Sequence, residues 1–155
     1  MKDTPTTLCF NYITIHTSVR HAKTMSDVID TDQELLQHLA PLPDGADRVE
    51  FWGSRGLAHP DHFGRFHTIP AFYLEVDSAD TPPLKALEKA VGIHEDISRI
   101  ECCYYNRDNG LLGYWFSDSG DTRVPYPKTR EEADVLTEAH PHLTSILFTL
   151  SMALN

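Results

Sequence analysis

The sequence has few cysteines, and they do not form a pattern. Cys9, Cys102 and Cys103 are an odd number, and the two adjacent residues would point to opposite faces if they lie on a strand. A disulfide framework is therefore not expected, and we predict free thiols in a reducing, cytoplasmic compartment. A cysteine nucleophile stays open as an alternative, although the sequence names no neighbouring base for it.

The sequence also lacks a long apolar run. Its first residues, MKDTPTTLCFNYITIHT, have neither the basic region nor the unbroken apolar region of a secretory signal. The most apolar stretch, residues 143–154, is shorter than the roughly 20 residues that cross a bilayer. Neither export nor a membrane span is predicted.

Basic residues are scarce compared with acidic ones. The chain has 13 Lys and Arg against 23 Asp and Glu, which gives a formal net charge of −10. This balance opposes direct binding of nucleic acid, which depends on clustered positive charge. It favours encounter with a basic protein partner, because opposite charges steer association.

The usual signatures of catalysis are missing too. We find no G-x-S-x-G, C-x-x-C or H-E-x-x-H pattern, and the stretch FWGSRG at 51–56 lacks the spacing and the Lys-Ser/Thr of a phosphate-binding loop. Without these signatures, the sequence favours a binding protein over an enzyme.

What is present indicates one α+β domain spanning residues 1–155, of ordinary globular composition. Alternation and β-branched residues predict a central strand at 8–17, strands at 47–53 and 68–77, and a β-hairpin at 98–118 that turns through NRDNG. Helical periodicity and capping residues predict helices at 31–39 (Thr31 and Glu34 as a capping box), 81–92 (Thr81 as N-cap), 129–139 and 143–154. Together these elements predict a mixed, largely antiparallel sheet of about five strands, covered by helices, with a C-terminal helical pair.

Two long irregular loops are expected as well. The first, residues 58–67 (AHPDHFGRFH), holds His59, His62 and His67 and leads into the strand that carries Glu75. Imidazole and carboxylate groups are ligands for Zn²⁺ or non-haem Fe²⁺, so these four residues are the predicted metal ligands, with His16 as a spare ligand or base. The spacing matches no standard site, and an ordinary surface loop or a metal-free general base remain alternatives. The second loop is 118–129.

Aromatic and arginine side chains are the other candidates for function. The hairpin is aromatic on both faces, and any face without a covering helix would be a binding surface, because Trp, Tyr and Arg dominate interface energetics. Three arginines, including Arg65, would meet an anionic small molecule if their loops converge. The predicted binding residues are Tyr105, Tyr114, Trp115, Trp52, Arg55 and Arg123.

These observations rank three functions. The first is a small acidic protein of the inhibitor, immunity or antitoxin type that binds a basic protein partner. The second is a small Zn- or Fe-dependent enzyme that uses the histidine-rich loop, and the third is a metal-free pocket for an anionic small molecule.

Overall fold

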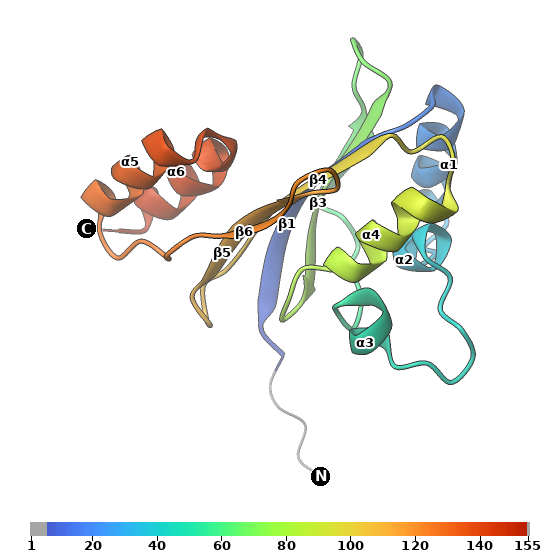
Figure 1. The fold of residues 1–155 in the computed structure, drawn as a ribbon, viewed down its shortest axis with the longest axis horizontal. Coiled ribbons are helices and arrows are strands. Elements are labelled where there is room, and N and C mark those ends of the chain that lie inside the picture. The colour runs from blue at the N-terminus through green and yellow to red at the C-terminus, as the bar shows by residue number, and fades with distance from the viewer. Residues whose placement is uncertain (1–5, 155) are drawn as a thin grey trace.

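A computed structural model of the protein describes residues 6–154 (Figure 1). This part of the chain forms six strands and six α-helices, with one 3-10 turn before the last helix. The strands are β1 (Leu8–His16), β2 (His62–Arg65), β3 (Ala71–Ala79), β4 (Arg99–Asn106), β5 (Leu111–Phe116) and β6 (Gly120–Arg123). The helices are α1 (Val19–Asp30), α2 (Leu35–Leu39), α3 (Arg48–Trp52), α4 (Leu84–Ile93), α5 (Arg130–Ala139) and α6 (Thr144–Met152), and the 3-10 turn is η1 (Pro141–Leu143).

The strands form one open sheet in the order β2-β3-β1-β4-β5-β6. The predicted α+β class and the central position of β1 are confirmed. The sheet is larger than the expected five strands, and every pairing between its strands is antiparallel rather than mixed.

Two hydrophobic cores lie on opposite faces of this sheet. Helices α1 to α4 cover one face, and the C-terminal pair of α5 and α6 covers part of the other (Figure 1). Alternation in β1 explains the division, because Cys9, Ile13 and Ile15 are buried in the first core while Phe10 packs against the second. The cysteines of β4 divide in the same way, since Cys102 belongs to the first core and Cys103 contacts the second.

The predicted strand at 47–53 is wrong, because these residues form helix α3. The Asp47 side chain accepts a hydrogen bond from the backbone N–H of Glu50 at 3.0 Å and caps the helix. Gly53 ends it with φ +85°, a left-handed conformation that glycine adopts without strain. Capping at both ends therefore outweighs the β-branched and aromatic character of the segment.

The first half of the chain also differs from prediction in its helices. Helix α1 was not predicted, because its buried stripe is made of His21, Ala22, Met25 and Ile29, only two of which are strongly apolar. Thr31 ends α1, so the expected capping box with Glu34 does not form. Glu34 instead caps the short helix α2 by itself, accepting from the N–H of Leu36.

Later elements agree better with the sequence. Helix α4 lies within the expected region, but it starts after Pro83 and not from Thr81, whose hydroxyl donates to the carbonyl of Gly53 at 2.5 Å. The hairpin β4–β5 is confirmed, with Gly110 at φ +68° in its turn. Helix α5 is confirmed with Thr129 as its N-cap, and α6 packs on the sheet as expected.

Both predicted irregular loops contain an unexpected strand. Residues 62–65 form β2 and residues 120–123 form β6, which are the two edge strands of the sheet. The two loops therefore lie at opposite edges and do not meet. Within the described residues, no helix is both long and apolar enough to cross a membrane.

Candidate metal centre

Three histidines from α1, α2 and the end of α4 meet on one side of the helical layer. His21 lies in the first turn of α1, His38 lies in α2, and His94 directly follows α4. One ring nitrogen of each lies within 4.8 Å of a ring nitrogen of the other two, and no second group of three such ligands is found between residues 6 and 154. The fold thus brings together side chains that are 17 and 56 positions apart in the sequence.

The spacing of the rings suits a tetrahedral metal ion. The ring centroids of His21, His38 and His94 are 5.1, 4.8 and 5.2 Å apart, taking the pairs 21–38, 21–94 and 38–94 in turn. Imidazoles bound to one tetrahedral ion, with bonds of about 2.0–2.1 Å, have their centroids about 5 Å apart. The ring spacing is therefore compatible with a shared ion, for which the three ligating nitrogens would also have to come within about 3.4 Å of one another.

A carboxylate orients His21. Its Nδ1 lies 3.0 Å from Oδ1 of Asp96, and because a carboxylate only accepts, Nδ1 carries the hydrogen and donates it. The Ser18 hydroxyl in turn donates to Oδ2 of Asp96 at 2.6 Å. This hydrogen bond contributes most to lowering the pKa of Asp96 below its usual value. The neutral His21 ring then presents the lone pair of Nε2 to the centre, as in carboxylate–histidine–metal sites.

Backbone carbonyls orient His94 by the same logic. Its Nε2 lies 3.1 Å from the carbonyl oxygens of both His38 and Leu39, so Nε2 carries the hydrogen. In the neutral ring, Nδ1 therefore keeps a free lone pair. His21 at Nε2 and His94 at Nδ1 would then each offer a lone pair to a metal ion.

His38 completes the group. Its Nε2 lies 2.8 Å from Nε2 of His21, a hydrogen bond in which His38 donates because the His21 nitrogen carries no hydrogen. Burial and the neighbouring His21 and His94 lower the pKa of His38, which favours the neutral ring. A metal ion would replace the shared hydrogen between these two nitrogens.

The site opens to solvent on one side. His21 is buried, His38 and His94 are half-buried, and Asp96 and Arg20 are exposed. The same surface cavity is lined by the three histidines together with Arg20, Thr24 and Asp96. An ion held by the imidazoles would therefore keep a coordination position that faces this cavity.

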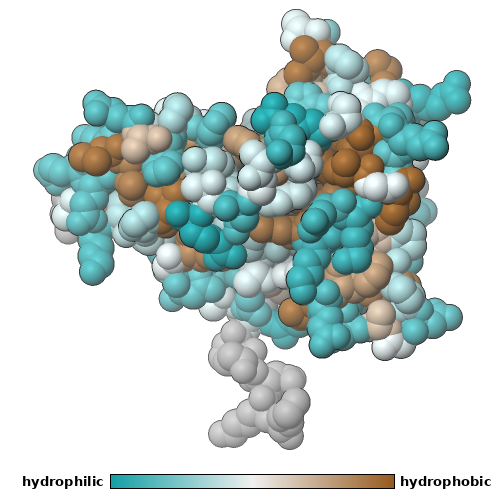
Figure 2. Space-filling view, in the orientation of Figure 1, coloured by the Kyte–Doolittle hydropathy of each residue, from teal (hydrophilic) through white to brown (hydrophobic). Residues whose placement is uncertain are grey.

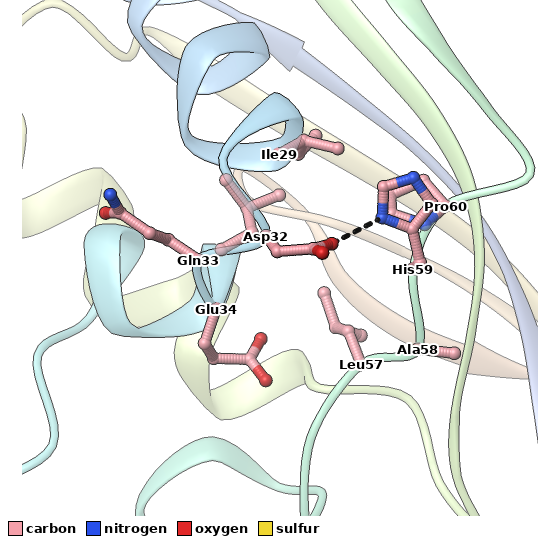
Figure 3. A pocket seen from close by; sticks show the side chains of 9 residues that line it. Ile29, Asp32, Gln33, Glu34, Leu57, Ala58, His59 and Pro60 are labelled. Atoms are coloured by element: carbon pink, nitrogen blue, oxygen red, sulfur yellow. Dashed lines mark ion pairs between the residues drawn. The ribbon is translucent and has the colours of Figure 1, made fainter.

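The histidine-rich loop is not brought together in this way. His59 lies 3.6 Å from Asp32 across a shallow cavity between the start of that loop and the end of α1 (Figure 3). His62 pairs with Glu75 in the register of β2 and β3, and His67 lines a separate cavity beside Val19. His16 lies on the other face of the sheet, 3.4 Å from Glu101. Of the four predicted metal ligands only His62 and Glu75 are neighbours, so the set does not converge on one point.

The predicted binding residues lie in different parts of the fold. Trp52 and Trp115 are buried in the first core, and Trp52 donates its indole N–H to the carbonyl of Ala40 at 2.7 Å. Tyr114 and Tyr105 pack against the second core. Arg55 is paired with Asp80 and Arg123 with Asp121, so the arginines do not form a common pocket.

Comparison with protein-family models, curated proteins and solved structures found no match to this chain. Sequence reasoning missed His21, His38 and His94 because no short spacing links them, and the one available signal was the total of nine histidines.

Proposed function

We propose that this protein is a small metal-dependent enzyme whose centre is a transition-metal ion held by His21, His38 and His94. The observation that supports it best is the convergence of three imidazoles, two of them already oriented by acceptors behind them. This proposal keeps the metal alternative drawn from the sequence and places it on different histidines.

Zn²⁺ is the ion that fits best. Three imidazole ligands with a fourth position for water are typical of catalytic zinc, whereas structural zinc sites use four protein ligands. Imidazoles also suit Fe²⁺, but the common non-haem iron site adds a carboxylate, and here both oxygens of Asp96 bind other side chains. The carboxylate therefore acts behind His21 rather than on the ion.

The chemistry that follows is activation of water. A Zn²⁺ ion lowers the pKa of its bound water to about 7 and so supplies a hydroxide nucleophile near neutral pH. Asp96 would strengthen His21 as a ligand, and the exposed side of the cavity would admit the substrate. We infer a hydrolytic or hydration reaction from this arrangement.

The proposal is tested with Co²⁺, which takes the same ligands as Zn²⁺ and absorbs visible light. We expect one Co²⁺ per chain, with absorption bands of four- or five-coordinate Co²⁺ that change with pH near 7 as the bound water ionises. The variant His94→Ala is expected to lose the bands. Failure to bind Co²⁺, or bands that do not change between pH 5.5 and 9, would contradict the proposal.

A second candidate function keeps the expectation of a basic partner. The outer face of β1 and β3 carries Tyr12, Tyr73, Glu75 and Asp77, which are exposed or half-buried, beside the exposed Asp61. Burial, followed by repulsion from Asp61, raises the pKa of Asp77. A cationic segment lying on this face would relieve that repulsion and cover Tyr12.

Figure 2 shows hydrophilic side chains over much of one side of the molecule, interrupted by hydrophobic patches over the C-terminal helices and over the other helices.

A lysine-rich peptide is the probe for the second function. Glu75→Lys is expected to weaken binding, whereas Glu138→Lys, an equal charge change on α5, is not. Equal losses in both variants would reduce the effect to net charge and contradict a specific surface.

The three cysteines described here are free, with Cys9 and Cys102 buried. Burial raises the pKa of Cys9 to about 12 and that of Cys103 to about 11, so neither thiol is activated as a nucleophile. Free thiols are typical of reducing compartments, and we propose the cytoplasm as the location.

A further inference from the structure

Two polar side chains of the cavity have no role in holding the proposed ion. Arg20 and Thr24 lie in the first half of α1 and line the same cavity as the three histidines. The Thr24 hydroxyl donates to the carbonyl of Arg20 at 3.1 Å, so its oxygen remains able to accept. Arg20 is the only cationic side chain in the lining.

Arg20 is one of the arginines that pair with no carboxylate within residues 6–154. It is exposed and takes part in none of the ion pairs formed among residues 6–154, whereas Arg55, Arg99 and Arg123 are each paired with a carboxylate. Asp96, the carboxylate nearest the centre, is bound by Ser18 and His21. The guanidinium of Arg20 is therefore free to bind a ligand.

The charges at the cavity favour an anion. Three neutral imidazoles leave the full double positive charge of the ion, Arg20 adds one positive charge, and Asp96 removes one. With the ion bound, this cavity would carry a net positive charge, although the chain as a whole has a formal charge of −10. A planar guanidinium beside a metal ion matches ligands with two or more oxygens, because one oxygen can bind each cation.

We propose that the open position of this centre takes a small oxyanion, a carboxylate or a phosphate, and that Arg20 binds its second oxygen. The proposal rests on the proposed function, since it requires the ion held by the three histidines. It names the substrate class of that centre as molecules that carry such a group.

The test uses the Co²⁺-loaded protein and two probes, inorganic phosphate and acetate. Each is titrated while the visible bands of Co²⁺ are recorded at constant ionic strength. We expect a saturable change in the bands with at least one probe, and the tighter probe shows whether the group is phosphate or carboxylate. Arg20→Gln is expected to weaken that binding about tenfold while Co²⁺ affinity stays within about twofold, because one charge-assisted hydrogen bond is lost.

Lys23→Gln is the matched control, since it removes the same charge from an exposed position on α1, where Lys23 pairs with Asp27. It should leave anion affinity unchanged. Equal weakening in both variants, or no spectral response to either probe, overturns the oxyanion site while the metal centre stands. If the unaltered protein does not bind Co²⁺, the metal centre and the oxyanion site are both overturned.

Discussion

The Nδ1 atom of His21 lies 3.0 Å from Oδ1 of Asp96, although 75 positions separate the two residues in the sequence. Ser18 connects them again, because its oxygen accepts from the backbone N–H of His21 and its hydroxyl donates to Asp96. The start of α1 and the loop after α4 are thereby held together behind one ring nitrogen. This arrangement orients an imidazole for a metal ion and is the basis of the proposed function.

Replacing this carboxylate is expected to weaken the metal centre without unfolding the protein. In Asp96→Ala, His21 loses its charged acceptor and keeps only the Thr17 hydroxyl, 3.1 Å from Nδ1, so we expect Zn²⁺ affinity to fall about 10- to 100-fold. Competition with a coloured chelator measures the affinity. Glu95→Ala, the same charge change at the adjacent exposed residue, is the control, and an equal loss in that variant would show that only net charge matters.

The packing of the hairpin gives a prediction about stability. A Cβ atom on Gly113 would lie 2.5 Å from the backbone oxygen of Thr122 and 2.5 Å from the hydroxyl of Tyr104. Gly113→Ala should therefore lower the free energy of unfolding by about 1–3 kcal/mol, because β5 and β6 must move apart. Urea unfolding followed by circular dichroism measures the difference.

Gly92 is the matched control for that change. It lies in α4 with nothing within 4 Å of its added Cβ, so Gly92→Ala should raise the free energy of unfolding by about 0.5–1 kcal/mol. If both alanine variants shift the unfolding midpoint in the same direction, the placement of one of these glycines is wrong.

The outcome for the fold shows which signals in the sequence are reliable. Alternation predicted β1 and β3, and the Asn-Gly turn predicted the β4–β5 hairpin, because these signals depend on local geometry. Helix α3 was mistaken for a strand since a helix of five residues is decided by its caps, Asp47 and Gly53. The short edge strands β2 and β6 have little apolar pattern and exist because a neighbouring strand offers hydrogen bonds.

The contacts of Asp80 with Thr7 and Arg55 predict how the stability of the protein depends on pH. Asp80 accepts from the backbone N–H and hydroxyl of Thr7 and from Arg55, and these interactions lower its pKa below the usual 3.8. A lowered pKa in the folded state stabilises the protein above the unfolded value, and this contribution is lost as pH falls through the folded pKa. Unfolding measured between pH 2.5 and 7 follows it.

We therefore expect Asp80→Asn to be less stable than the unaltered protein at pH 6 and to converge with it at the acid end of that range. Asparagine tolerates the left-handed backbone at this position, where φ is +63°, so the comparison isolates the charge. A stability difference that stays constant down to pH 2.5 would contradict the assignment of this carboxylate.

The candidate site was predicted much less well than the fold. The sequence indicated metal chemistry from its histidines, but it selected four candidates between residues 59 and 75. Of these, His62 and Glu75 are paired across β2 and β3, while His59 and His67 line two separate cavities. The converging set depends on the packing of α1, α2 and the end of α4. Helix α1 was absent from the prediction, and α2 occupies only the second half of the helix predicted at 31–39. The spacing of histidines along the sequence does not reveal how these helices pack against one another.

The most direct test of the metal centre is the stoichiometry of Zn²⁺ in three proteins prepared under the same conditions. We predict one equivalent of tightly bound Zn²⁺ in the unaltered chain, less than about one tenth of that in His38→Ala, and a full equivalent in His62→Ala, because His62 lies outside the centre. A metal-free unaltered chain, or a loss caused by His62→Ala and not by His38→Ala, would contradict the proposed centre.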